Sequence, residues 1–110
     1  MRRVVITGLG AVTPIGNDVQ TTWKGLLSGA IGVDTIQSFD SSAFNSHIAA
    51  EVKNFDPVSY LNPKEARRTE RFVQFAVAAA HQAVEDSGIK VGQEDPFRYG
   101  VIVGSGIGSM

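Results

Sequence analysis

Two short runs of consecutive apolar residues constrain the fold of this chain most. Val4-Val5-Ile6 leads into Thr7-Gly8, and Val101-Ile102-Val103 stands between Gly100 and Gly104. A continuous apolar run, unlike an alternating one, is typical of a strand covered on both faces, as in a parallel sheet. Such strands need neighbouring strands and helices on both faces of the sheet. The sequence therefore predicts an α/β fold.

The sequence predicts only two helices, which are too few to cover both faces of such a sheet. Asn17 or Asp18 can cap a helix of about ten residues, whose apolar side chains recur at helical spacing up to Gly29. The strongest helix is expected over residues 68–86, where two adjacent apolar stripes rich in alanine indicate burial on most sides and a close approach by another backbone. Gly88 is placed to end this helix. We therefore expect residues 1–110 to be a fragment, or one part of a larger assembly.

The remaining segments predict only short elements. Residues 29–45 are small, polar and irregular in pattern, which is typical of a surface loop. Residues 48–52 could form a short edge strand. The pairs Asp56-Pro57 and Asn62-Pro63 indicate turns or helix starts, because proline fits the first position of a helix.

Composition narrows the classes of function. The formal net charge of −1 gives no global field for nucleic acid or for an anionic membrane. The chain has no cysteine, which excludes disulfides, thiolate metal sites and thiol catalysis within it. No apolar run has the length of a signal core or a membrane span, so we expect a cytoplasmic protein.

The glycine-rich turn after the first apolar run raises the possibility of a nucleotide site. Gly8 and Gly10 fit the start of the dinucleotide fingerprint, and Asp34 is a possible acidic partner. However, Thr13 occupies the place of the third glycine, and Pro14 removes an N–H from the cradle. Glycines that serve tight turns and close packing are the favoured interpretation.

A basic strip is the most conspicuous charged feature. Lys64, Arg67, Arg68 and Arg71 are spaced so that they would share one face of a helix. Such a strip can dock an acidic partner and accelerate the encounter. The alternative is a solvated face with internal pairs to the intervening glutamates, and the spacing alone does not choose between the two.

The other polar residues form no recognisable catalytic or metal-binding pattern. His47 and His81 are the only histidines, and no acidic or cysteine partner stands at ligand spacing from His81, so neither is expected to bind metal. Ser105 and Ser109 lie in a glycine-rich turn that lacks the spacing of a nucleophile elbow, so a hydrolytic serine is not expected.

Taken together, these residues resemble the β-ketoacyl-acyl carrier protein synthase family. The matching segments follow the family's order along nearly the whole chain: residues 2–10 and 13–17, Thr22-Trp23, Leu26, Phe39-Asp40, Phe55-Asp56, residues 67–72 with Ala76, and residues 104–108. The resemblance implies a thiolase-like fold, a five-layer αβαβα sandwich of which residues 1–110 form the start of the first half. It also implies a homodimer. We expect no cofactor or metal, and charge and apolar run length give no reason to expect nucleic acid or a membrane as a partner.

The resemblance further implies a decarboxylative Claisen condensation between an acyl thioester and malonyl-acyl carrier protein, in fatty acid synthesis. The family's catalytic cysteine and two histidines match no position of this chain, so the chain alone is expected to be inactive. Ile107 matches a position that lines the acyl pocket in type II-like members, although Ser109-Met110 departs from the Gly-Leu often found there. Lys64, Arg67 and Arg68 match basic positions that meet the acyl carrier protein, which favours binding as the role of the strip.

Two alternatives remain open on the sequence. A non-catalytic chain-length-factor-like partner of a polyketide synthase shares this N-terminal pattern but lacks the nucleophilic cysteine, which would lie outside this chain. A nucleotide-binding oxidoreductase is disfavoured by Thr13 and Pro14.

Overall fold

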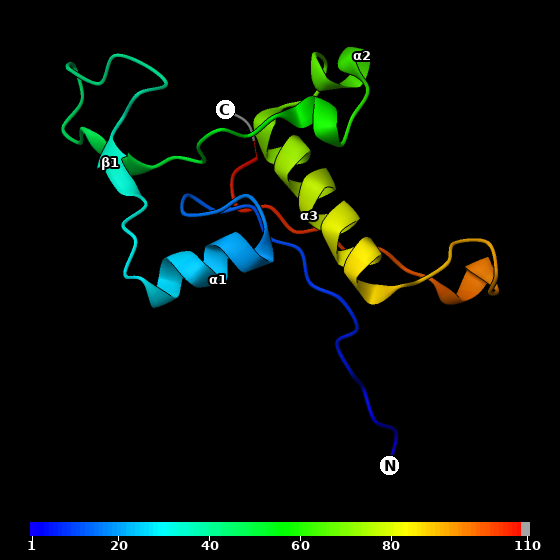
Figure 1. The fold of residues 1–110 in the computed structure, drawn as a ribbon. Helices are drawn as coiled ribbons and strands as arrows, with labels where there is room; N and C mark the ends of the chain where they lie inside the picture. The colour runs from blue at the N-terminus through cyan, green and yellow to red at the C-terminus, as the bar shows by residue number, and fades with distance from the viewer. Residues whose placement is uncertain (109–110) are drawn as a thin grey trace. The chain divides into compact units, whose positions relative to one another are not determined.

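The computed structural model describes residues 1–108, and the chain divides into two compact units. The first unit combines residues 1–10 with the chain from residue 57 onward, and the second unit comprises residues 11–56. Figure 1 shows the helices and strands of both units, coloured along the chain. The first unit contains the longest helix of the described residues, and the second contains a two-stranded antiparallel hairpin.

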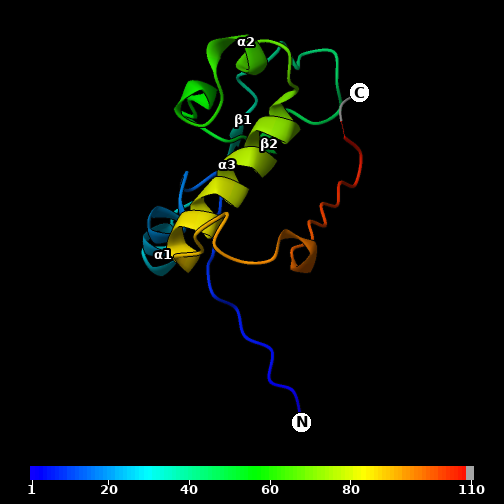
Figure 2. The same ribbon diagram turned by 90° about the vertical axis from the view of Figure 1, so that its right-hand side faces the viewer.

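One long helix, α3 (Arg71–Ser87), organises the first unit. Three shorter elements accompany it: η1 (Pro57–Ser59), α2 (Pro63–Ala66) and η2 (Pro96–Arg98). Figures 1 and 2 both show α2 at the N-terminal end of α3. The chain just after η1 contacts the middle of α3, where the Gln82 amide donates to the Tyr60 hydroxyl at 3.2 Å and the rings of Tyr60 and His81 meet edge to face.

The prediction of a long alanine-rich helix is confirmed, but its expected burial on most sides is wrong. The helix begins at Arg71 rather than residue 68, and it ends where Gly88, with a φ of 68°, adopts the left-handed conformation. Only Gln74 and Ala78 of α3 are buried, whereas Phe72 is 39% exposed. Only short segments contact α3 in the described residues, so Val73 and Val77 are half-buried, and Ala80 and Val84 are exposed.

The N-terminal segment packs backbone to backbone against α3. A Cβ atom at Gly10 would overlap the carbonyl oxygen of Ala79, and a Cβ at Gly8 would overlap the helix backbone one turn further along. The Leu9 N–H donates to the Asp86 carboxylate at 2.9 Å. The prediction that the alanines of this helix let another backbone come close is confirmed, and the glycines are the other half of that contact.

Neither continuous apolar run forms a strand in the described residues. Residues 4–6 and 101–103 are irregular and exposed, with Val4 95% and Ile102 100% exposed. The prediction of two buried strands is therefore wrong for this structure. A strand exists only through hydrogen bonds to a neighbouring strand, and residues 1–108 place no strand beside either run.

The second unit begins with a turn that leads into helix α1 (Val19–Leu27). Thr13 and Gly16 form an antiparallel bridge through backbone hydrogen bonds of 2.8 and 3.2 Å. Of the two predicted caps, Asn17 and Asp18, the structure uses Asp18, and its carboxylate accepts the Thr21 N–H at 2.7 Å. The predicted helix of about ten residues is confirmed, because apolar spacing and a cap agree at this position.

The hairpin of the second unit pairs β1 (Val33–Thr35) with β2 (Ile48–Ala50), and Asp34 stands opposite Ala49. Strand β2 was predicted as an edge strand and is confirmed, although it ends at Ala50. Strand β1 lies inside residues 29–45, where the sequence predicts an irregular loop, so that prediction is wrong for its three residues. Three residues carry too short a pattern to indicate a strand, and β1 exists because β2 pairs with it.

The loop between the two strands is tied to the chain after β2. The Glu51 carboxylate accepts the Gln37 N–H at 2.9 Å, and it also accepts hydrogen bonds from the backbone and hydroxyl of Ser38. Within the loop, the rings of Phe39 and Phe44 meet edge to face with centroids 5.6 Å apart. The carboxylate therefore fixes where the loop leaves the hairpin.

The close approach of Gly10 to α3 generates a prediction. Gly10→Ala is expected to lower the free energy of unfolding by about 2 kcal/mol, because the added methyl overlaps the Ala79 carbonyl and forces the two backbones apart. Urea unfolding of the variant and of the unaltered protein measures the difference. Gly100→Ala is the matched control, since a Cβ there meets no atom within 4 Å. Equal loss of stability in both variants would contradict the packing role of Gly10.

Candidate functional site

Helix α2 carries the first residue of the predicted basic strip and is fixed at its N-terminus by reciprocal hydrogen bonds. The Asn62 side-chain oxygen accepts the N–H groups of Lys64 and Glu65 at 3.1 and 2.9 Å. In return, the Glu65 carboxylate accepts the Asn62 amide at 2.6 Å. Pro63 occupies the first helical position, where its missing N–H has no partner to lose. The cap and the proline together fix the backbone that carries Lys64, although α2 is only four residues long.

The strip is not one helical face, and that prediction is wrong. Helix α2 ends at Ala66, Arg67 is its C-cap, Arg68 lies in the following turn, and Arg71 begins α3. The Pro63 and Glu65 carbonyls still accept the backbone N–H groups of Arg67 and Thr69, and each also accepts a side-chain donor. The Thr69 hydroxyl donates to the Glu65 carbonyl at 2.9 Å, and Arg67 Nε donates to the Pro63 carbonyl at 3.1 Å.

The basic side chains nevertheless share one short exposed stretch. Lys64, Arg67 and Arg68 are all exposed and form no ion pair with a carboxylate among residues 1–108. Arg71 lies over the ring of Phe75, with its guanidinium 5.0 Å from the ring centroid. We call Lys64, Arg67 and Arg68 the basic cluster. Its charges are therefore directed to solvent, where an acidic partner could meet them.

An apolar cavity of about 430 Å³ lies between α3 and the segment after residue 100. Its walls are mostly apolar side chains of these two segments, with Ser105 at one edge: Phe72, Val73, Ala76, Val77, Ala80, Val101, Val103, Gly104 and Ser105. The Ser105 hydroxyl accepts the Gly108 N–H at 3.0 Å and closes the turn that carries Ile107, which is 75% exposed. Ser105 therefore has a structural contact here, and Ile107 does not line this cavity. Ser109 and Met110, the departure from the type II-like pattern, lie outside the described residues.

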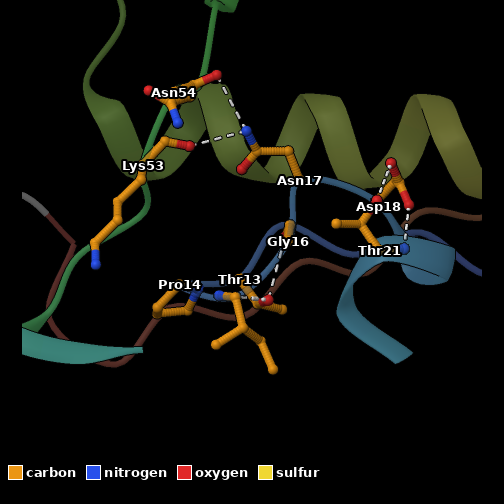
Figure 3. Close-up of a pocket in the computed structure, with 9 residues that line it drawn as sticks. Thr13, Pro14, Gly16, Asn17, Asp18, Thr21, Lys53 and Asn54 are labelled. Carbon is orange, nitrogen blue, oxygen red and sulfur yellow. Dashed lines mark hydrogen bonds between the residues drawn. The ribbon is translucent and has the colours of Figure 1, made fainter. Parts of the chain in front are cut away.

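A second cavity, of about 350 Å³, lies where the glycine-rich turn meets the start of α1 (Figure 3). The Asn17 amide donates to the carbonyls of Lys53 and Asn54 at 2.9 and 3.1 Å. The Asp18 carboxylate lies at the N-terminus of α1, and hydrogen bonds from the Thr21 backbone and hydroxyl lower its pKa. A phosphate at this helix end would meet a carboxylate that stays ionised. The site therefore disfavours the nucleotide alternative.

Neither histidine belongs to the basic cluster or lines either cavity. His47 Nδ1 contacts the Ser41 carbonyl at 3.0 Å inside the loop of the second unit. His81 lies on α3 with Nδ1 3.4 Å from the Glu85 carboxylate, one turn along the helix. The expectation that no acidic partner stands at ligand spacing from His81 is therefore wrong, because Glu85 is four residues along the helix. Asp34, the proposed acidic partner of the nucleotide alternative, pairs instead with Lys53 at 3.7 Å.

Comparison with known proteins assigns the chain to a family. The family model for the β-ketoacyl synthase N-terminal domain matches residues 1–110. The chain is 53% identical over 109 residues to 3-oxoacyl-[acyl-carrier-protein] synthase 2 of Coxiella burnetii, and 48% identical over 109 residues to the protein of the same name from Staphylococcus aureus. The chain belongs to the β-ketoacyl synthase family. The matched region spans 99% of this chain but only 26% of the length of each relative.

Solved ketosynthase structures agree with the assignment. The ishigamide ketosynthase/chain length factor superposes with a TM-score of 0.73 at 38% identity, over 81% of this chain and 22% of the other. A type II polyketide ketosynthase in complex with its acyl-carrier protein superposes with a TM-score of 0.67 at 26% identity, over 89% of this chain and 24% of the other. The fold is therefore part of the α/β, thiolase-like ketosynthase fold, as the resemblance implied. Within residues 1–108, no helix is long and apolar enough to cross a membrane.

The sequence did not reveal how the basic cluster of this β-ketoacyl synthase segment is supported. The Asn62–Glu65 pair has the spacing of a capping box and could have been found from the sequence. Gln74, whose amide reaches back to α2, gave no such signal, because it lies on the next helix and its partners are backbone carbonyls.

The cap of α1 generates a prediction about pH. Asp18→Ala is expected to destabilise α1 by about 1 kcal/mol, since the Thr21 N–H loses its acceptor. The pKa of Asp18 is lowered in the folded chain, so its stabilising effect is present above the ordinary aspartate pKa and is lost as pH falls through the lower folded-state pKa. Amide hydrogen exchange of Thr21 measures both effects.

Asp18→Asn is the control, because asparagine keeps an acceptor for the Thr21 N–H but does not titrate. It is expected to leave α1 nearly as stable and to remove the acid dependence. Unchanged exchange at Thr21 in Asp18→Ala would show that the cap does not hold this helix.

Proposed function

We propose that this chain is the N-terminal segment of a condensing enzyme of fatty acid synthesis, a β-ketoacyl-acyl carrier protein synthase. The observation that carries the proposal is its 53% identity, over 99% of its length, to a protein named 3-oxoacyl-[acyl-carrier-protein] synthase 2. In the proposed reaction, an acyl group passes from its carrier thioester to a cysteine of the enzyme. Malonyl-acyl carrier protein then loses carbon dioxide, and the resulting carbanion attacks the acyl thioester on the cysteine. The cysteine thiolate leaves, and the product is a β-ketoacyl-acyl carrier protein two carbons longer than the acyl group.

Residues 1–110 contribute docking and pocket residues to this reaction rather than its nucleophile. The chain has no cysteine, and His47 and His81 do not match the family's catalytic positions. Residues 1–110 would form the start of the N-terminal domain in a cytoplasmic homodimer that requires no cofactor. Under this proposal, a chain-length-factor-like partner is the competing function, because one similar solved structure is a ketosynthase/chain length factor.

The basic cluster is proposed as the docking surface for the acyl carrier protein. Lys64, Arg67 and Arg68 are exposed and form no ion pair among the described residues, so no internal carboxylate has to be displaced when an acidic surface approaches. Charged groups of this kind steer encounter and fix the register of a complex. A solved structure similar to this chain contains a ketosynthase with its acyl-carrier protein, which supports the same kind of partner here.

Ile107 is proposed to line the acyl pocket. Its side chain is 75% exposed on a turn closed by the Ser105–Gly108 hydrogen bond, so it is available to contact a substrate or a covering segment. A branched side chain at this position would limit the room for the acyl chain, and the flanking glycines allow the backbone to turn closely.

Charge reversal of the cluster tests the proposed partner. In the full-length protein, Lys64→Glu/Arg67→Glu/Arg68→Glu is expected to raise KM for acyl-carrier-protein substrates about 100-fold at low salt, because three attractive contacts become repulsive. Condensation of acyl- with malonyl-acyl carrier protein measures it. Lys90→Glu, an exposed lysine beyond α3, is the control and is expected to change KM less than threefold.

The unaltered full-length protein decides the proposed reaction itself. Condensation by this protein alone supports the proposal. If the protein by itself does not condense the substrates but does so once a second ketosynthase subunit is added, the chain-length-factor alternative is supported instead. An unchanged KM in the charge-reversed variant would rule out docking through the basic cluster.

A substitution at Ile107 tests its placement in the pocket. Ile107→Trp is expected to reduce kcat/KM for long acyl substrates at least about tenfold while retaining activity on short ones, because added volume shortens a closed pocket. Product lengths from a mixture of acyl primers measure the effect. A uniform loss for all acyl lengths would contradict a role in selecting chain length.

A further inference from the structure

We infer that Gln74 is a positioning residue for carrier docking, and this inference rests on the proposed function of the basic cluster. Gln74 is one of two buried residues of α3, and it is 9% exposed. Its side-chain amide donates to the Ala66 carbonyl at 2.8 Å and to the Thr69 carbonyl at 3.1 Å. These carbonyls flank Arg67 and Arg68, so one amide holds both ends of the arginine segment.

The arginine segment needs such a restraint because α2 cannot hold itself. A helix of four residues is shorter than the length at which helix formation becomes favourable in isolation. The Asn62 cap fixes the beginning of α2, but Arg67 and Arg68 lie at and beyond its end. There, the backbone leaves the helix and must turn into α3. Gln74 is the contact that joins this turn to the long helix.

Burial makes the contact difficult to replace. Both amide protons of Gln74 are used on carbonyls at the end of α2 and in the turn, where water is partly excluded. Removing the amide would leave two carbonyls of half-buried residues without this donor, which costs more than the hydrogen bonds alone. The segment would then sample other conformations, and the Arg67 and Arg68 guanidinium groups would be spread over more positions.

Loss of order in the arginine segment would weaken binding of the carrier protein and leave the condensation step itself unchanged. A partner that binds an ordered cluster does not have to order it during association, so an unrestrained segment weakens binding through the entropy of fixing it. Gln74 itself does not face the partner, because it is buried. A small thioester that lacks the carrier protein does not contact the cluster, so its reaction should not depend on Gln74.

The experiment compares Gln74→Met with Gln82→Met in the full-length protein. Both change a glutamine of α3 to a side chain of similar size, but Gln82 donates to the Tyr60 hydroxyl rather than to the end of α2. Gln74→Met is expected to raise KM for acyl-carrier-protein substrates about fivefold to tenfold. Its kcat/KM for the pantetheine thioester of the same acyl group should change less than twofold, and Gln82→Met should not separate the two substrates.

A double-mutant cycle shows whether Gln74 acts through the arginines. In the Arg67→Ala/Arg68→Ala background, Gln74→Met is expected to have little further effect on KM for carrier substrates. An equal loss on carrier and pantetheine substrates, an unchanged KM, or an undiminished effect in the arginine-free background would each overturn the inference. If Gln74→Met folds poorly, Gln74→Asn, one methylene shorter, should show the same separation of substrates.

Failure of the proposed function gives a different result. If the unaltered protein does not use carrier substrates, or if Arg67→Ala/Arg68→Ala leaves KM unchanged, the docking role of the cluster fails and the inference fails with it. If the arginine variant weakens binding and Gln74→Met does not, docking stands and only the role of Gln74 is overturned.

Discussion

The contacts made by α3 are the constraint on which the first unit depends. Gly8 and Gly10 pack against its backbone, Tyr60 meets its middle, and Gln74 extends from it to the end of α2. Each contact joins α3 to a segment that has too few residues to be stable alone. Ala78 is the one apolar residue that the described chain buries completely. Positioning in this unit therefore comes from specific close contacts rather than from a large apolar core.

Side-chain caps perform a similar role wherever a short element begins. Asp18 caps α1, Asn62 caps α2, and Asp95 caps η2, and in each case the side-chain oxygen accepts a backbone N–H that the helix leaves without a partner. In the hairpin unit, Glu51 satisfies the backbone of the connecting loop in the same way. These local contacts explain how elements of three to nine residues are ordered with little burial.

The sequence predicted the elements whose causes are local. The spacing of apolar residues located α1 and α3, the cap at Asp18 and the glycine at Gly88 located helix ends, and Pro63 located the start of α2. It failed for the two apolar runs, because composition indicates that a segment can form a strand but not that a partner lies beside it. It also extended the basic strip over one helix, because side-chain spacing does not show that the Gln74 amide and the Thr69 hydroxyl bind carbonyls at the break.

The sequence by itself determined the family, the basic residues of the candidate docking site and the types of its helices, since these depend on residue identity and on neighbours a few positions away. Only the tertiary structure decided that Arg67 and Arg68 lie at the end of a four-residue helix, and that a buried amide from the next helix holds them there. The physical reason is that both partners of Gln74 are backbone carbonyls. A carbonyl group is present at every residue, so nothing in the side-chain sequence marks which of them will be bound.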